Sequence, residues 1–448
     1  MTPDASGAHA VAEPSAKAAV PDRTGPGAGP LQSWLLTGLF FCIPLPIAAA
    51  YVLSAVLLVV WLVERRAEAG RHMPRTFSPL PWIFLAYYAV LLASVAWSAD
   101  SEWAWRMVRR QNFFLLFLLY FSVARRTDGE RHLSAFLLAM ALCELLAFYN
   151  WTRMHWMPDW PAGIHVRKDP ADSAPFVDHI LYAPMLAFAA YLAAHRFLFG
   201  LRRRWWRWLH AALFAATAGN LLISGGRAGV IGFLALLMLL IVQRLGDRPL
   251  RALLVAGTVA TVLALAGYHG SDYLGQRVDE MVDELADPGP DSPVSIRSRL
   301  VYAQNAWRIF VDHPWAGVGI GDYPQVYAQV NAQHTPDWEP AWNPHNQYLY
   351  ALTAAGIAGG ATLLAVLLVP LLLPGPIDGL RHVRRALPLF FILLCFSESY
   401  LMRSNTSLMY VLFTAALWAR GDRETCSGRV CGPQGREPGR VPEPCNAS

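Results

Sequence analysis

Apolar stretches long enough to cross a lipid bilayer recur along this chain, and they constrain its fold more than any other feature. A membrane helix needs roughly 17–25 residues to cross ~30 Å of hydrocarbon. The first stretch, residues 31–63, is too long for one crossing, and Pro44 and Pro46 near its middle predict two short helices with a tight turn between them. The other candidates are residues 80–98, 111–125, 132–151, 179–200, 209–224, 229–244, 250–268, 345–373, 386–401 and 404–419. We therefore expect an all-α polytopic membrane protein with about twelve transmembrane helices.

The composition favours a membrane protein over a soluble or nucleic-acid-binding one. Of the 448 residues, 55% are hydrophobic and only 15% are charged, which is unusual for a soluble domain. The isoelectric point near 8.9 would fit nucleic-acid binding, but the arginines lie in short loops between apolar stretches, the arrangement that orients membrane helices. We expect membrane lipids as neighbours and no nucleic acid as a partner.

The arginine-rich loops agree with a single orientation, because short cytoplasmic loops carry an excess of Arg and Lys. With the N-terminus in the cytoplasm, the interior loops contain Arg65, Arg66, Arg71 and Arg75; Arg125, Arg126 and Arg131; Arg202, Arg203, Arg204 and Arg207; Arg244, Arg248 and Arg251; and Arg381, Arg384 and Arg385. Both termini are then cytoplasmic.

The six cysteines lie in apolar stretches or in the C-terminal tail, and they predict neither a disulfide framework nor a zinc site.

This topology divides the chain into five parts. Residues 1–30, rich in Ala, Gly and Pro, are expected to be a disordered cytoplasmic N-terminus, and residues 420–448 a cytoplasmic tail. Transmembrane helices 1–9 would occupy residues 31–268, and helices 10–12 residues 345–419. Residues 269–344 would form a large, partly helical loop on the opposite face.

The large loop is acidic, with eleven carboxylates against four arginines. Its apolar residues repeat at helical spacing until Asp312-His313-Pro314 ends the pattern, and they are Leu300, Ala303, Trp307, Phe310 and Val311. Gly317, Gly319 and Gly321 then predict a flexible glycine turn. As a nucleotide-binding fingerprint this glycine pattern is weak, because it neither follows a strand nor opens a helix.

The stretch Asn343-Pro344-His345 places an imidazole at the start of an apolar helix. Asn343 suits the N-cap and Pro344 the first helical position, which makes His345 a first-turn residue. The positive end of the helix dipole disfavours imidazolium there, so a neutral base is plausible. Gly356 and Gly360 form a GxxxG pair that would let another helix approach closely. The alternative interpretation is that His345 only lines the membrane interface.

Several arginines would lie on the same outward face. Arg227 stands in Ser224-Gly225-Gly226-Arg227, where one helix ends and the next begins, and its alternative role is a snorkelling interface arginine. Arg297 and Arg299 flank Ser298 at the start of the loop helix and would point in different directions, about 200° apart. We favour Arg299 as the anion-binding residue; otherwise these arginines balance an acidic loop.

The remaining polar groups on this face have structural explanations of equal or greater weight. Arg106, Arg109 and Arg110 lie beside Trp103 and Trp105, a pattern that favours membrane anchoring over catalysis. The other groups are Asp178 with His179 and Glu398 with Arg403, each of which suits a structural pair near a helix end.

Arginines and a neutral histidine at such an interface suit the displacement of a pyrophosphate by a sugar hydroxyl. The arginines would offset the charge of the leaving group, and the histidine would take the hydroxyl proton. A glycosidase would need two facing carboxylates, and the acidic residues between Asp279 and Asp291 show no such pairing.

Three motifs in order resemble the O-antigen ligase and polymerase superfamily. They are Ser-Gly-Gly-Arg-Ala-Gly (224–229), Ser-Arg-Leu (298–300) followed by Asp-His-Pro-Trp-Ala-Gly-Val-Gly (312–319), and Pro-His-Asn-Gln-Tyr-Leu (344–349) with Ala-Gly-Ile-Ala-Gly (355–359). The resemblance covers roughly residues 179–373. Tyr302 departs from it, since relatives often have tryptophan there, and Arg297 beside Arg299 leaves the arginine register open.

The resemblance implies an inverting, metal-independent glycosyltransferase of the GT-C type, with no cofactor, in a bacterial inner membrane and with a periplasmic site. Such ligases move O-antigen from undecaprenyl pyrophosphate to a sugar hydroxyl of the lipid A core. Carried onto this chain, the resemblance implies His345 as the base and Arg227 with Arg299 or Arg297 as the pyrophosphate-binding residues. Possible supporting residues are Asn346, Arg106, Arg109, Arg110, His179 and Arg403.

Two alternatives lie within the superfamily: a polymerase that joins repeat units on the lipid carrier, and a protein O-oligosaccharyltransferase. One dominant outer loop and a compact chain favour the ligase.

From a different class, a lipid-linked glycan flippase or transporter would also have many helices. It should carry polar or broken helices in two internal repeats near the midplane, and no such repeat is evident in the sequence.

Overall fold

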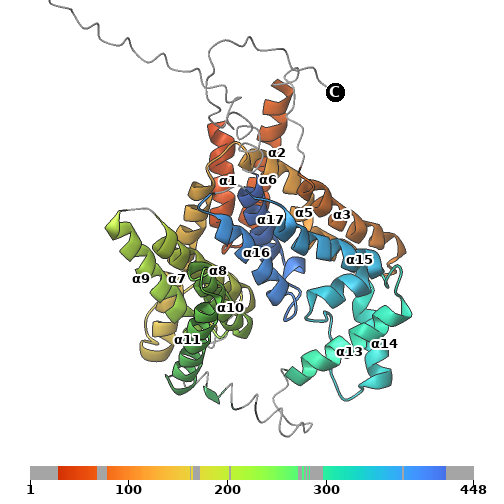
Figure 1. Cartoon of the computed structure of the whole chain (residues 1–448). Coiled ribbons are helices and arrows are strands. Elements are labelled where there is room, and N and C mark those ends of the chain that lie inside the picture. The colour runs from red at the N-terminus through yellow and green to blue at the C-terminus, as the bar shows by residue number, and fades with distance from the viewer. Residues whose placement is uncertain are drawn as a thin grey trace, which may run out of the picture.

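The protein is all-helical throughout the part that the computed structural model describes (Figure 1). The described residues are 29–67, 78–161, 163–164, 172–200, 203–270, 275–276, 279, 282, 296–375 and 378–419. In chain order the elements are α1 (Pro30–Cys42), α2 (Ile47–Ala67), α3 (Leu80–Ala93), the 3-10 helix η1 (Ser94–Trp97), α4 (Ser101–Arg110), α5 (Asn112–Leu115), α6 (Phe117–Ala124), α7 (Gly129–Trp156), α8 (His179–Phe199), α9 (Arg204–Ile223), α10 (Arg227–Arg244), α11 (Pro249–Gly270), α13 (Ile296–Asp312), α14 (Tyr323–His334), α15 (Gln347–Leu372), α16 (Arg381–Leu394), η2 (Tyr400–Met402) and α17 (Ser404–Trp418).

The first apolar stretch is divided in two, as its prolines predict. α1 ends at Cys42, a turn closes with the backbone N–H of Leu45 bonded to the carbonyl of Cys42 at 3.0 Å, and α2 begins at Ile47. Pro44 and Pro46 lie in the break, where their missing N–H groups leave no helical hydrogen bond unmade.

Among the described helices, six are long and apolar enough to cross a membrane. They are α2, α3 continued by η1, α7, α8, α10 and α15. Within the described residues the other apolar stretches add no further span, and the expected count of about twelve crossings stays a prediction. The architecture agrees with a polytopic membrane protein.

Apolar side chains face outward along several of these helices. On α7, Leu138, Leu142 and Leu145 are all exposed and recur every three or four residues, which places them on one face. The valines of α2 from Val52 to Val63 repeat the pattern. Contiguous exposed apolar surface of this kind is unfavourable in water and is the surface that lipid covers.

The interior is organised around α8 and α17. Every α17 residue from Asn405 to Trp418 is buried, and Phe413 makes edge-to-face contacts with Phe40 of α1, Phe136 of α7 and Phe188 of α8. Figure 1 shows α7 to α11 gathered on one side of α17 and α13 to α15 on the other.

The loop helix forms and ends at Asp312, as its apolar pattern predicts, but several residues of that pattern are exposed. Leu300, Trp307 and Val311 of α13 are exposed. The buried face carries Ala306 and Ile309, which pack with Tyr323 and Tyr327 of α14. The less apolar side of α13 is buried because α14 packs a small, tyrosine-rich core against it.

The glycines after α13 pack closely, and the expected flexible turn is not what the structure has. A Cβ on Gly317 would lie 2.4 Å from the carbonyl oxygen of Thr353, and one on Gly319 would lie 2.4 Å from the Ser98 hydroxyl. Both residues have positive φ, 66° and 93°. The segment is therefore wedged between α15 and the residues that precede α4.

The GxxxG pair of α15 also acts differently from the prediction. Gly356, at φ 61° and ψ −152°, interrupts the helix, and a Cβ there would meet the carbonyl oxygen of Trp315 at 2.3 Å. The backbone N–H of Ile357 donates to the carbonyl of Pro314 at 2.8 Å. The missing side chain of Gly356 therefore lets the backbone of Pro314 and Trp315 approach α15, and not a second helix.

The predictions for the N-terminal lead and the C-terminal tail lie outside the described residues, apart from Gly29 and Pro30. Much of the acidic part of the large loop, including residues 283–295, does so as well.

Candidate active site

His345 lies just before α15, not in its first turn. The helix begins at Gln347, and its N-cap is Asn346, whose side-chain oxygen accepts from the N–H groups of Tyr348 and Leu349 at 2.9 and 3.1 Å. His345 has φ 50°, uncommon for a residue other than glycine. The prediction of Asn343 as the cap was wrong because the side chain of Asn343 is engaged elsewhere, and the side chain of His345 turns toward a carboxylate.

The imidazole of His345 is paired with buried Glu398. Its Nδ1 lies 2.7 Å from Oε2 of Glu398, whose side chain is 2% exposed, whereas that of His345 is 26% exposed. Glu398 also accepts from the side-chain amide of Asn343 at 2.7 Å and the N–H of Ser399 at 2.9 Å, and Arg403 lies 3.6 Å away.

These contacts fix the ionisation of Glu398. Burial alone would raise the pKa of Glu398, but the hydrogen bond from His345 and the charge of Arg403 outweigh it and lower this pKa to about 2. Because the carboxylate is ionised at neutral pH, the hydrogen of the shared bond belongs to Nδ1. Nε2 is then the nitrogen that can accept a proton.

The segment between α16 and α17 that carries Glu398 is fastened to the start of α15. Gln347 accepts from the N–H groups of Leu401 and Met402 at 2.9 and 3.1 Å, and its own N–H donates to the carbonyl of Cys395 at 2.8 Å. The hydroxyl of Ser399 donates to Asn343 at 2.7 Å. The His345–Glu398 pair is therefore held from both chain segments.

Of the two neighbouring arginines on α13, Arg299 lies close enough to Tyr400, two residues after Glu398, for its charge to act there. Tyr302, one turn further along, stacks on His345 with ring centroids 5.7 Å apart. The charge of Arg299 acts on Tyr400, as do those of Glu398, Arg403 and Asp178. Arg297 instead lies over Trp338, 5.7 Å from the ring centroid.

Tyr400 marks the point where these charges converge. Burial raises its pKa, and its hydroxyl has no hydrogen-bond partner among the described residues. Because Asp178 precedes α8 and Arg299 belongs to α13, the beginnings of both helices lie around the segment that carries Glu398.

Arg227, at the N-terminus of α10, lies near the N-terminus of α8. Gly226 and Gly229 pack so closely on α8 that a Cβ at either would lie within 2.4 Å of the Cβ of Ala183. Arg227, the first residue of α10, is exposed. The glycines therefore set Arg227 beside the first turn of α8, where His179 lies.

His179 has a carboxylate partner, but a different one from Asp178. Its Nδ1 lies 3.0 Å from Oδ2 of Asp172, which also accepts from the N–H of His179 at 3.1 Å. Burial opposes ionisation of Asp172, yet these hydrogen bonds lower its pKa. Asp178 instead caps α8, accepting from the N–H of Leu181. We interpret the His179–Asp172 pair as structural, because it holds the loop before α8 against the start of that helix.

The three arginines of α4 separate into two kinds. Arg106 pairs with Glu102 at 2.9 Å, and Arg109 donates to the carbonyl of Trp105. Arg110 lies over the ring of Trp342 at 6.0 Å, and Arg403 lies over the same ring at 5.8 Å. Burial, and next the like charge of Arg403, lower the pKa of Arg110.

A ring shared by two guanidinium groups makes a locally positive surface. Trp342 precedes Asn343 by one residue, so this surface adjoins the His345–Glu398 pair. Cations close together in a partly buried place repel each other, and an anion between them would relieve that repulsion. The arrangement offers a base nitrogen next to arginines that can hold a phosphate.

Sequence reasoning underrated Glu398, Arg403 and Arg110. The signal was present in Glu398 and Arg403, two charges in an otherwise apolar region, where charged residues are rare and usually paired. The pairing itself could not be read from the sequence because 53 residues separate Glu398 from His345.

The fold and this cluster define a class: a helical membrane protein with a histidine–carboxylate pair and arginines gathered at one end. Comparison with protein families gives a closer assignment, since residues 211–364 match the model described as O-antigen ligase. The match shows that this part of the chain is similar to the O-antigen ligase family. It spans Arg227, Arg297, Arg299 and His345, and it ends before Glu398 and Arg403. A comparison with curated proteins found no match.

Proposed function

We propose that this protein is an O-antigen ligase, an inverting glycosyltransferase of the GT-C type that works without a metal. It moves O-antigen polysaccharide from undecaprenyl pyrophosphate to a sugar hydroxyl of the lipid A core. The observation that carries the proposal is the His345–Glu398 pair, set beside arginines at one end of the helical bundle.

In this reaction Nε2 of His345 takes the proton of the acceptor hydroxyl as the oxygen attacks the anomeric carbon. The bond between that carbon and the pyrophosphate oxygen breaks, and its electron pair leaves with undecaprenyl pyrophosphate. Attack from the face opposite the leaving group inverts the anomeric configuration. Glu398 keeps Nδ1 protonated and stabilises the imidazolium that forms.

The positive charge that a metal supplies in other phosphate-handling enzymes comes here from arginine. Arg299 and Arg227 hold the pyrophosphate, and Arg403 and Arg110 extend the positive surface around Trp342. Guanidinium groups bind phosphate oxygens through paired N–H donors, so they bring both charge and orientation. Asn346 acts indirectly, by capping α15 behind His345.

We place the site on the periplasmic face of the bacterial inner membrane. The supporting argument is the arginine distribution, which puts both termini in the cytoplasm and the large loop outside when there are about twelve crossings. α13 and α14 belong to that loop, and Tyr302 of α13 contacts His345.

The acceptor decides between this proposal and its relatives. Purified protein should be given a polyprenyl-pyrophosphate glycan with lipid A core, with a second carrier-linked glycan, or with an acceptor peptide, and the products separated by mass. We expect transfer to lipid A core. Extension on the carrier would identify a polymerase, transfer to the peptide a protein glycosyltransferase, and movement of the glycan across a vesicle membrane without transfer a flippase.

A further inference from the structure

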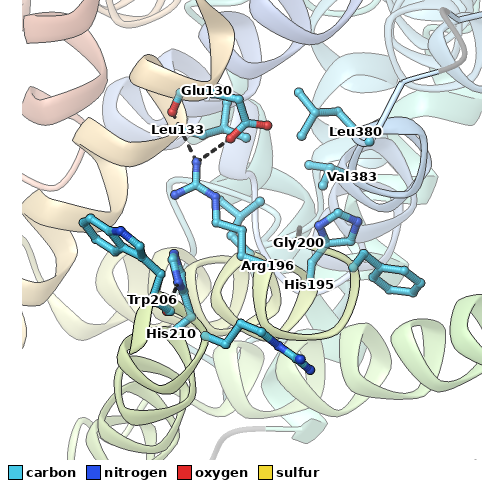
Figure 2. Close-up of a pocket in the computed structure, with 13 residues that line it drawn as sticks. Glu130, Leu133, His195, Arg196, Gly200, Trp206, His210, Leu380 and Val383 are labelled. Atoms are coloured by element: carbon cyan, nitrogen blue, oxygen red, sulfur yellow. Dashed lines mark hydrogen bonds and ion pairs between the residues drawn. The ribbon is translucent and has the colours of Figure 1, made fainter. Parts of the chain in front are cut away.

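A second site lies at the other end of the bundle, where α7, α9 and α16 begin and α8 ends (Figure 2). It is a pocket of about 250 Å³. His195 on its wall follows His179 by sixteen residues of α8, so about 24 Å of helix separates the pocket from the arginine-rich end. That distance approaches the thickness of the hydrocarbon layer.

His195, which lines the pocket, has a buried ring nitrogen with no hydrogen-bond partner among the described residues. This nitrogen is Nε2, and the residue is 4% exposed. The ring is held by aromatic neighbours, with centroids 4.9 Å from Phe199 and 5.9 Å from His382. Buried polar atoms nearly always have a partner. Because His195 lines the pocket, a ligand seated there is the partner that we assign to this nitrogen.

The charges around the pocket are mainly positive. Arg196 is neutralised by Glu130, to which it donates at 2.9 Å (Figure 2). Arg207 on the rim has its Nε donating to the carbonyl of Phe197, and it forms no ion pair within the part of the chain that the structure describes. Arg203 and Arg204 precede it in the chain. A ligand that enters here meets cations first.

The rest of the pocket suits a lipid. Leu133, Leu192 and Leu380 line it, while Trp205 and Trp208 of α9 are exposed next to the arginines. Exposed tryptophan beside arginine is typical of the membrane–water interface. The volume is below the ~300–1,000 Å³ of pockets that enclose drug-sized ligands, so it admits a head group and not a polysaccharide.

We propose that this pocket binds the phosphate head group of an anionic membrane lipid, with His195 and Arg207 donating to the phosphate oxygens. The leucine wall contacts the start of the acyl chains. Basic pockets between membrane helices bind anionic head groups in this way. The inference stands apart from glycan transfer, because it rests on a different end of the molecule.

Native mass spectrometry of the delipidated full-length protein tests this proposal. The probes are phosphatidylglycerol, phosphatidylcholine and inorganic phosphate, and the variants are His195→Phe and Arg207→Gln. His195→Phe keeps the ring stacking and removes both nitrogens. Arg251→Gln is the matched control, since Arg251 is an exposed arginine near the start of α11 that does not line the pocket.

We expect phosphatidylglycerol to bind the wild type and the control in preference to phosphatidylcholine. Each pocket variant should bind it roughly ten- to a hundredfold more weakly, the effect of losing one hydrogen bond to a charged group. Equal binding of the two lipids, or full binding by both variants, would overturn the proposal. Inorganic phosphate binding as tightly as the lipid would also overturn it, in favour of a free anion. Arg207 lies on the rim of the pocket, so its variant decides the matter if His195→Phe does not fold.

Discussion

His345 is held by a carboxylate at one ring nitrogen and by the face of Tyr302, which leaves one nitrogen for chemistry. An imidazole fixed in this way loses little freedom when a hydroxyl binds, which is the advantage of a preorganised base. Glu398 is a positioning residue in this account, because it acts through His345 and does not touch the acceptor.

We predict that Glu398→Gln lowers kcat by roughly 10²–10⁴-fold while the KM for the acceptor stays near its wild-type value. Glutamine can hold the ring but cannot stabilise the imidazolium. Steady-state kinetics on the purified variant check this, with Glu339→Gln as an exposed control on the loop. A fall in acceptor affinity at unchanged kcat would contradict the positioning role.

The same substitution also has a pH signature. Folding lowers the pKa of Glu398 from its ordinary 4.5 to about 2, so the carboxylate stabilises the folded state fully above pH 4.5. That stabilisation, on the order of 3 kcal/mol, is lost as the pH falls from 4.5 toward 2. The gap in Tm between wild type and Glu398→Gln should therefore shrink as the pH falls below 4.5. A gap of constant size down to pH 3 would exclude this ionisation.

The two arginines of α13 provide a matched pair. We predict that Arg299→Gln reduces glycan transfer by about 10²-fold or more, the range for losing a group that stabilises developing charge. Arg297→Gln should reduce it by less than about tenfold, since Arg297 is packed on Trp338. Parallel transfer assays check this, and the reverse order of effects would move the anion site toward Trp338.

At the scale of elements, the break in α15 joins the loop helices to the membrane helices. Gly356 adopts a backbone conformation that is essentially limited to glycine, and the carbonyl of Trp315 fills the place of its missing Cβ. The docking of the loop on α15 places α13, and with it Tyr302, next to His345.

We predict that Gly356→Ala destabilises the protein by at least about 2 kcal/mol, from backbone strain and the clash together. Thermal unfolding in detergent measures this. Gly257→Ala on α11 is the control, since a Cβ there would meet nothing within 4 Å, and it should change stability by about 1 kcal/mol or less. Equal stability of the two variants would show that the loop does not depend on this break.

The sequence predicts elements well where one physical signal dominates, and poorly where two segments must meet. Hydrophobicity and proline located α1, α2 and the start of α8 closely. The buried face of α13 could not be read from its own apolar pattern, because tyrosines of α14 decide it. The start of α15 was wrong because Asn343 is occupied by Glu398, a contact that no local pattern encodes.

At the scale of the whole molecule, the two ends of the bundle have different chemistry. One end contains His345, Glu398 and the arginines whose charges act on Tyr400. The other end contains a basic pocket with exposed tryptophans beside it. Motif resemblance named His345 and Arg299, which belong to the first end, and also Arg227, which the structure places beside the first turn of α8. The partners Glu398, Arg403 and Trp342 needed the fold, because the segments that carry them approach only through helix packing.

The topology makes a prediction for the two ends, to be tested after the native cysteines have been replaced. In Ala332→Cys, at an exposed position of α14, the new thiol should react with a membrane-impermeant reagent that reaches the periplasm of intact cells. In Asp247→Cys, in the exposed turn between α10 and α11, it should react only after the inner membrane is opened. The opposite pattern would invert the proposed orientation and place the candidate site in the cytoplasm.

The most direct measurement of the central claim compares glycan transfer by the purified wild type and His345→Ala. Both receive a polyprenyl-pyrophosphate glycan and lipid A core, in the presence of a chelator. The account predicts that the wild type transfers the glycan with inversion, that the chelator does not slow it, and that His345→Ala is slower by roughly 10²–10⁴-fold although it folds and still binds the donor. Transfer by His345→Ala at the wild-type rate would remove the histidine from catalysis and contradict the account.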